Sequence, residues 1–279
     1  MSTSTRDEVE LHYERHGTGE PLLLIHGFGA STYSWRFVTP ALANEHSVIA
    51  LDLKGFGASP KPEGGDYSAA EQARLAASFV RKHDIAGMTL VGHSFGGAVA
   101  LLLALALTSD ARYRPKRLML IDTAAYPQRL PFFMRVLRNP LLGRLAGMLL
   151  PDRFQVRYVL KLAYYDDTRI PDEAVTMYAK ALGMPGGRAA LRLTAAHLVP
   201  PDIEEITARF SGIDIPTLIV WGRQDEIVPL AVGERLHRNI PNSKMTVIDR
   251  CGHIPHEECP EVALRIMLDF LSEHPTDGR

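Results

Sequence analysis

Cysteine and long apolar runs are both scarce in this chain of 279 residues. Its two cysteines, Cys251 and Cys259, are too few for a disulfide framework, and we expect both to be free, buried thiols. No uninterrupted apolar run reaches the length of about 18 residues that a membrane-spanning helix needs. Residues 1–10 are polar and lack the apolar centre of a secretory signal. The expected compartment is therefore the cytoplasm.

An excess of charge of one sign is also missing. The sequence has 31 Lys and Arg against 32 Asp and Glu, a net charge of −1. Because nucleic-acid binding usually needs a basic stripe interleaved with aromatic residues, we expect no nucleic-acid partner. Gly/Ser linkers, repeats and low-complexity tracts are absent as well, which predicts one domain with an insertion. Hydrophobic residues make up 46% of the chain, enough for a large core.

Short apolar runs separated by helical stretches predict an α/β fold with a mostly parallel sheet. The runs do not alternate between polar and apolar residues, as expected of strands that helices cover on both faces. They lie at residues 22–25, 48–51, 88–91, 118–121, 218–220 and 245–248. Ser68 and Glu71 form a capping-box pattern that predicts a helix to about Lys82, and a last helix is expected from Pro260 to Leu271.

The stretch from residue 123 to residue 210 breaks this alternation. It has many prolines and apolar residues at helical spacing, but no comparable strand-like run. Such a stretch is typical of a helical cap inserted into an α/β core. We therefore assign residues 1–123 and 211–279 to the core domain and residues 124–210 to a helical cap.

The most informative motif is Gly-His-Ser-Phe-Gly at residues 92–96, between a strand-like run and a helix-like run. A strand, a sharp turn and a helix in this order form a nucleophile elbow, in which the central serine is strained and exposed. Glycines at 92 and 96 remove the side chains that would clash in so tight a corner. Ser94 is therefore the candidate nucleophile, and His93 is expected to pack beside it.

Two loops that follow buried runs supply partners for this serine. Asp225 comes directly after the run that ends at residue 220, and His253 lies in a Gly/Pro-bounded loop after the run that ends at residue 248. The chain order Ser, Asp, His is the one that accompanies a nucleophile elbow. Two alternatives stay open: Asp122, which follows another strand-like run, could be the acid, and His256 could be the base.

Together these motifs resemble the α/β-hydrolase superfamily, and the resemblance extends from about Val9 to about Leu271. His-Gly-Phe-Gly at 26–29 resembles the family's oxyanion loop, and the segment 52–59 is similar to its D-x-x-G-x-G-x-S loop. The resemblance implies an α/β-hydrolase fold, and an oxyanion hole made by the backbone N–H groups of Phe28 and Phe95.

The expected function is that of a serine hydrolase that cleaves carboxylic esters through an acyl-enzyme at Ser94. His253 would accept the serine proton, and Asp225 would hold the imidazole in the useful tautomer. This chemistry requires no metal and no organic cofactor. His26 is expected to order the oxyanion loop. The residues expected to line an apolar substrate pocket are His26, Phe132, Phe133, Leu137 and Ile254.

Other reactions of the superfamily are less well supported by the residue types. Members that dehalogenate alkanes or open epoxides carry an aspartate where this chain has Ser94. Members that cleave carbon–carbon bonds usually carry an aromatic residue after the catalytic histidine, whereas this chain has Ile254. That reaction stays an alternative, as does a ligand receptor or signalling protein that keeps the triad and turns over slowly.

The expected cap contains an unusually basic segment at residues 127–160. Six arginines and one aspartate give it a local charge of +5. One interpretation is an amphipathic cap whose apolar face roofs the active site. The other adds a peripheral membrane contact, because an apolar face rimmed by arginine can settle on an anionic lipid surface. The arginines are Arg129, Arg135, Arg138, Arg144, Arg153 and Arg157.

Overall fold

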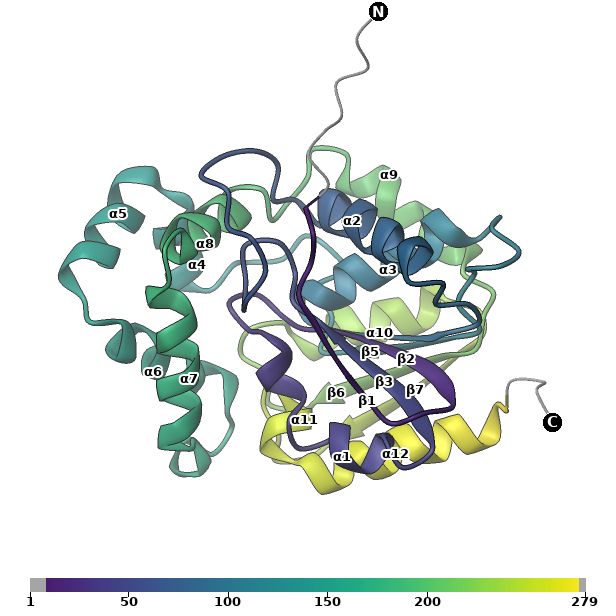
Figure 1. The fold of residues 1–279 in the computed structure, drawn as a ribbon. Helices are drawn as coiled ribbons and strands as arrows, with labels where there is room; N and C mark the ends of the chain where they lie inside the picture. Colours follow the sequence, from purple (N-terminus) through teal and green to yellow (C-terminus); the bar gives the residue numbers. More distant parts are fainter. Residues whose placement is uncertain (1–8, 276–279) are drawn as a thin grey trace, which may run out of the picture.

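A twisted sheet of seven strands lies at the centre of the computed structural model, which describes residues 9–275 (Figure 1). Its order is β1-β3-β2-β4-β5-β6-β7, and every neighbouring pair is parallel except β1 with β3. The strands are β1 (Tyr13–His16), β2 (Glu20–Ile25), β3 (His46–Leu51), β4 (Thr89–His93), β5 (Arg117–Ile121), β6 (Thr217–Gly222) and β7 (Ser243–Ile248). The predicted mostly parallel sheet is confirmed.

Strand β1 is the one strand of the sheet that the sequence analysis did not predict. All four of its residues are exposed, so it contains no apolar run. It lies at the edge of the sheet and pairs antiparallel with β3. An antiparallel edge strand can face solvent, whereas each of the six other strands contains an apolar run that is visible in the sequence.

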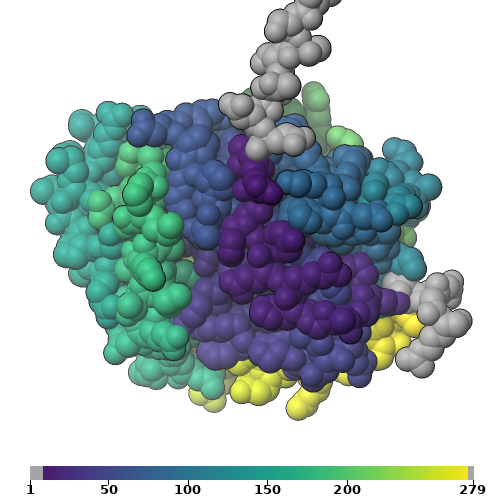
Figure 2. Space-filling model, in the orientation of Figure 1, coloured from purple at the N-terminus to yellow at the C-terminus, as the bar shows by residue number. Residues whose placement is uncertain are grey.

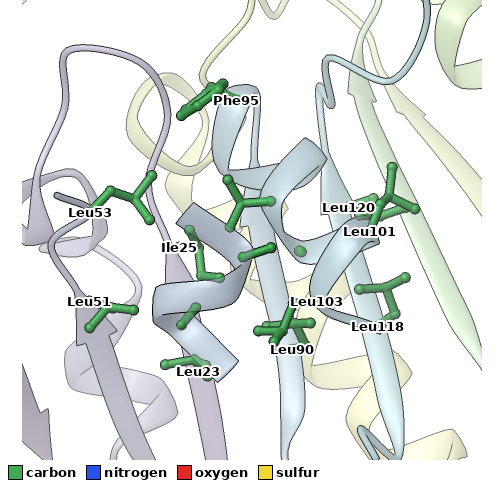
Figure 3. Packing of buried hydrophobic residues seen from close by; sticks show 14 of the residues in the cluster. Leu23, Ile25, Leu51, Leu53, Leu90, Phe95, Leu101, Leu103, Leu118 and Leu120 are labelled. Carbon is green, nitrogen blue, oxygen red and sulfur yellow. The ribbon is translucent and has the colours of Figure 1, made fainter. Parts of the chain in front are cut away.

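Helices cover both faces of the sheet, and the alternate residues of each strand divide between two cores. Leu23 and Ile25 face the core under α2, α3 and α10, whereas Leu22 and Leu24 face the core under α1 and α12. Figure 3 shows the first core, where Leu101 of α3 lies beside Leu120 and Leu103 of α3 beside Leu90. The covering helices are α1 (Thr39–Leu42), α2 (Ala69–Lys82), α3 (Phe95–Leu107), α10 (Leu230–Asn239), α11 (Pro255–Glu258) and α12 (Pro260–Glu273), with the 3-10 turns η1 (Thr32–Trp35) and η3 (Arg209–Gly212).

The predicted start of α2 is confirmed, although only half of the capping box forms. The Ser68 hydroxyl accepts a hydrogen bond from the Glu71 N–H at 3.2 Å, as a helix N-cap should. The Glu71 carboxylate pairs with Arg74 instead of reaching back, and the Ser68 N–H donates to Asp66. The last helix, α12, extends two residues beyond its predicted end.

Six helices are inserted between β5 and β6, and no strand occurs between residues 122 and 216. They are α4 (Phe132–Arg138), α5 (Pro140–Leu149), α6 (Asp152–Ala163), α7 (Asp172–Gly183), α8 (Gly187–Ala196) and α9 (Ile203–Ala208), with the 3-10 turn η2 (Asp167–Arg169). Figure 1 shows α4 to α8 grouped beside one end of the sheet, and we call these five the insert; α9 lies apart from them, near α2 and α3. The domain limits at 124 and 210 stay a prediction.

Two expectations from composition can be compared with the structure. Both cysteines are free thiols, Cys251 buried and Cys259 half-buried. Within residues 9–275 no helix is long and apolar enough to cross a membrane.

Candidate active site

Ser94 occupies a strained turn between β4 and α3. Its φ of 53° and ψ of −118° lie in a region that residues with a side chain rarely adopt. A Cβ at residue 92 would lie 2.5 Å from the Gly96 carbonyl oxygen, and one at residue 96 would lie 2.3 Å from that of His26. Only glycine fits at both positions. The turn therefore brings Ser94 close to the loop that begins at His26.

The hydroxyl of Ser94 forms a hydrogen-bonded chain with His253 and Asp225. The distance from Ser94 Oγ to His253 Nε2 is 2.8 Å, and that from His253 Nδ1 to Asp225 Oδ2 is 2.7 Å. Because the carboxylate accepts, Nδ1 carries the ring proton and Nε2 can accept the serine proton. The other oxygen, Asp225 Oδ1, accepts from the N–H groups of Ile227 and Val228. These bonds fix the carboxylate against its own loop.

Asp122, the alternative acid, lies beside this chain without orienting the histidine. Its Oδ1 accepts from the Gly222 N–H at 2.9 Å, and its Oδ2 has no hydrogen-bond partner within residues 9–275. Burial, and then the neighbouring charge of Asp225, raise the pKa of Asp122 well above its ordinary value. These two causes favour the protonated form of Asp122 more than for an ordinary aspartate. The geometry favours Asp225 as the partner of His253.

The donor atoms of Asp122, Asp225 and His253 lie within 4.8 Å of one another, a spacing that a metal ion could also accept. However, His253 Nδ1 and Asp225 Oδ2 are already hydrogen-bonded to each other, and the raised pKa of Asp122 opposes its ionisation. Metal ligands must be deprotonated and free to coordinate. We therefore interpret this cluster as the hydrogen-bonded pair of Asp225 and His253 with a second buried acid beside it.

His256, the alternative base, is a buried packing residue. Its ring lies 4.5 Å from that of Trp35, centroid to centroid, and neither ring nitrogen has a partner among the described residues. Burial, and then the charges of Arg36 and His253, lower the pKa of His256 to about 3. A neutral ring without contact to Ser94 is a poor candidate for the base.

His93 holds the loop that carries the base, a role that sequence reasoning missed. Its Nε2–H donates to the backbone carbonyl of His253 at 2.8 Å, because a carbonyl can only accept. Burial, and then the nearby His256 and His253, lower the pKa of His93 well below its ordinary value, so the ring stays neutral. His93, which directly precedes Ser94, therefore helps to position His253.

Glu258 links the insert to the same loop. Its carboxylate accepts from the N–H groups of Gly252 at 2.7 Å, Tyr165 at 3.1 Å and Asp166 at 2.9 Å. The last two residues follow α6 directly. In addition, the His253 N–H donates to the carbonyl of Ala163, the last residue of α6, at 2.7 Å. The position of the base thus depends on contacts with the insert.

Glu257 forms a second link, to α7. It accepts from the Tyr178 hydroxyl and forms an ion pair with Arg36, both at 2.6 Å. Burial raises the pKa of Glu257 from its ordinary value, while Arg36 and Tyr178 oppose that shift. The sequence predicted no role for Glu257 or Glu258. Adjacent acids next to a catalytic-loop histidine were the available signal.

The oxyanion loop lies against Ser94. A Cβ at residue 27 would lie 3.2 Å from the Ser94 Cβ, so the loop approaches the nucleophile closely. His26 holds it: its Nε2 accepts from the Leu53 N–H at 3.1 Å, and its Nδ1–H donates to the Gly27 carbonyl at 2.8 Å. Neither the Phe28 nor the Phe95 N–H has a hydrogen-bond partner within residues 9–275. Both amides are free to bind an anion, and Phe95 begins helix α3.

The expected substrate-pocket residues lie on α4 and on two loops, and they differ in burial. His26 is fully buried with both ring nitrogens bonded to backbone, so it supports the loop and does not line a pocket. The Phe132 ring is 65% exposed and faces solvent. Ile254 packs in the core, and Phe133 and Leu137 are half-buried on the insert. Their spacing predicted an apolar helix face, but not what that face contacts.

A surface hollow of about 610 Å³ lies elsewhere, at the edge of the sheet. Its lining includes His12 and Glu14 near β1, Arg36 after η1, and Met177 and Lys180 of α7, but none of the three residues of the hydrogen-bonded chain. The hollow is therefore not the site around Ser94.

Comparison with known proteins agrees with this architecture. A family model described as the alpha/beta hydrolase fold matches residues 20–260. The chain therefore belongs to the α/β-hydrolase fold family, and it is a hydrolase. It is 29% identical to Lipase 3 of Moraxella sp. (strain TA144), over 92% of this chain and 79% of the relative.

Two solved structures are similar over nearly the whole chain. A thermophilic esterase from Thermogutta terrifontis has a TM-score of 0.80 and 29% identity, with 98% of this chain and 97% of that chain covered. A meta-cleavage product hydrolase from Pseudomonas fluorescens has a TM-score of 0.80 and 27% identity, with 95% of each chain covered. Enzymes of two different specificities are thus about equally similar to this chain.

Substitution by asparagine is expected to affect activity differently at Asp225 and at Asp122. Asp225→Asn should lower kcat by about 10⁴-fold, the scale measured when a serine protease loses its orienting carboxylate. Asp122→Asn should cost at most about tenfold, because Asp122 accepts from the Gly222 N–H and makes no hydrogen bond to His253. Steady-state hydrolysis of a chromogenic ester measures both. A severe loss in Asp122→Asn beside a mild one in Asp225→Asn would reverse the assignment.

Glu258→Gln should destabilise the protein and lower kcat together. The amide presents N–H groups where one carboxylate oxygen accepted, and each backbone N–H left unpaired costs about 1–3 kcal/mol of unfolding free energy. Denaturant unfolding and ester turnover are the measurements. Glu261→Gln is the matched control, since Glu261 is exposed in the first turn of α12. Equal behaviour of the two variants would remove the structural role given to Glu258.

Proposed function

We propose that the protein is a serine hydrolase that cleaves carboxylic esters, with an apolar acyl or lipid-like substrate. The observation that carries the proposal is the chain from Ser94 through His253 to Asp225, at 2.8 Å and 2.7 Å. A serine hydroxyl is a weak nucleophile until its proton has an acceptor, and His253 Nε2 is within reach.

The proposed reaction proceeds through an acyl-enzyme. Ser94 Oγ attacks the ester carbonyl carbon as its proton moves to His253, and Asp225 stabilises the resulting imidazolium. The N–H groups of Phe28 and Phe95 bind the oxyanion of the tetrahedral intermediate. His253 returns the proton to the leaving alcohol. Water then attacks the acyl group by the same proton path, which releases the acid and restores Ser94.

One residue favours ester hydrolysis over the carbon–carbon bond hydrolysis that some relatives perform. Ile254 follows His253 where members of the superfamily that cleave carbon–carbon bonds usually carry an aromatic residue. The second candidate is a carbon–carbon bond hydrolase, which the similarity to the meta-cleavage product hydrolase favours. A third is a receptor that keeps the triad and turns over slowly.

Ser94→Ala should abolish both ester hydrolysis and labelling by a fluorophosphonate probe, with the fold intact. A loss of about 10⁴-fold or more is expected if the three residues act as a unit. Ser211→Ala is the control, because Ser211 is exposed and bonds only to the Ala208 carbonyl. A Ser94→Ala protein with a tenth of the parent activity would place the nucleophile elsewhere.

A substrate panel should separate the three candidates. We expect a higher kcat/KM for p-nitrophenyl octanoate than for the acetate, because a longer acyl chain buries more apolar surface. Faster turnover of a 2-hydroxy-6-oxo ring-fission dienoate than of any ester would favour the carbon–carbon bond hydrolase. A labelled Ser94 with a single burst and no turnover would favour the receptor. A preference for acetate would contradict the apolar acyl group.

A further inference from the structure

Helix α5 turns its apolar side to solvent. Five of its ten residues are exposed leucines or methionine, and Met148 and Leu149 are 81% and 75% exposed. Leu150 and Phe154, which follow along the chain, are exposed as well. We call the five α5 residues the apolar stripe. They are Leu141, Leu142, Leu145, Met148 and Leu149.

The stripe is one face of the helix and not a scatter of residues. At about 100° per residue, its five positions fall within an arc of about 120°. The remaining face carries Gly143 and Gly147 towards α8: a Cβ at these positions would lie 3.0 Å from Arg192 Cδ and 3.4 Å from Arg188 Cδ. Thus α5 packs inward through glycine and presents its large apolar residues outward, the reverse of a helix that roofs a core.

This orientation overturns one interpretation of the basic segment. An amphipathic cap would bury the leucines of α5 over the active site, but Figure 1 shows α5 at the outer edge of the insert. Helices α4 and α8 both pack against it. Figure 2 shows the same teal region forming one side of the molecular surface. The apolar stripe is therefore available to a partner outside the molecule.

Uncompensated positive charge accompanies the stripe. Arg135, Arg138 and Arg144 lie on α4 and α5, all are exposed, and residues 130–151 contain no acid. Within the part of the chain that the structure describes, none of the three forms an ion pair. Burial, and then the nearby Arg144, lower the pKa of Arg192 from its ordinary value, as expected where cations crowd without counter-charges.

The apolar stripe and the arginines beside it together indicate what kind of partner this surface fits. A second copy that used the same surface in a symmetric contact would bring the two sets of arginines together, and like charges repel. An anionic lipid surface satisfies both features at once, since its phosphates pair with arginine and its acyl boundary accepts leucine and methionine. The surface also has the composition of helices that lie in the plane of a membrane interface.

We propose that α5, with the arginines of α4 and α5, docks the protein on anionic lipid membranes. The apolar stripe enters the boundary between headgroups and acyl chains, and Arg135, Arg138 and Arg144 contact the lipid phosphates. Docking does not involve Ser94. It therefore holds or fails independently of the proposed ester hydrolysis.

Vesicle co-sedimentation tests this proposal. The full chain should bind vesicles of phosphatidylcholine with phosphatidylglycerol at low salt, bind phosphatidylcholine alone much more weakly, and dissociate as salt rises. The double variant Met148→Glu, Leu149→Glu should bind at least about tenfold more weakly, because it removes two large apolar side chains from the stripe and adds two charges that anionic lipid repels. Arg138→Gln with Arg144→Gln should weaken binding about fivefold per arginine, at about 1 kcal/mol each.

Controls separate docking from misfolding and from catalysis. Val262→Glu places the same charge on an exposed apolar position of α12 and should leave binding unchanged. Circular dichroism should show the double variant folded, and Ser94→Ala should bind vesicles like the parent protein. No binding at low salt, or equal binding by the parent and the double variant, would overturn the proposal. So would a dimer that the double variant dissociates while vesicles stay unbound.

Discussion

The strained turn at Ser94 is the constraint on which the rest of the site depends. A positive φ at a residue with a side chain persists only where the surroundings enforce it, and here the end of β4, the start of α3 and the loop at His26 crowd one corner. The same crowding brings free amides to Ser94 and leaves its hydroxyl available, since Ser94 does not cap α3. The geometry that strains the backbone thus also assembles the groups that a serine nucleophile needs.

The histidine loop is held from two sides, which ties the chemistry to the insert. His93 of the core donates to the His253 carbonyl, whereas Ala163 at the end of α6 accepts from the His253 N–H. Behind the ring, burial and then the charge of Asp225 raise the pKa of Asp122, which reduces repulsion between the two acids. The position of His253 in this chain therefore depends on the inserted helices as well as on the core.

The insert has an inner side that contacts the core and an outer side that is exposed. Its inner contacts support the base, and its outer helix α5 offers leucine, methionine and arginine to the surroundings. Similarity to both an esterase and a meta-cleavage product hydrolase shows that the fold alone does not choose a substrate. Specificity must therefore come from side chains near Ser94.

Local sequence determined the six parallel strands, the helix at Ser68 and the glycine-bounded turn at Ser94, because each rests on neighbouring residues alone. It also named Asp225 and His253, through their places after buried strands. Only the tertiary structure decided that Asp225, and not Asp122, contacts His253, and that Glu258 anchors the loop, since crossover connections bring together residues far apart in the chain. It also decided the orientation of α5: periodicity defines an apolar face, but only packing decides whether that face meets a core or the solvent.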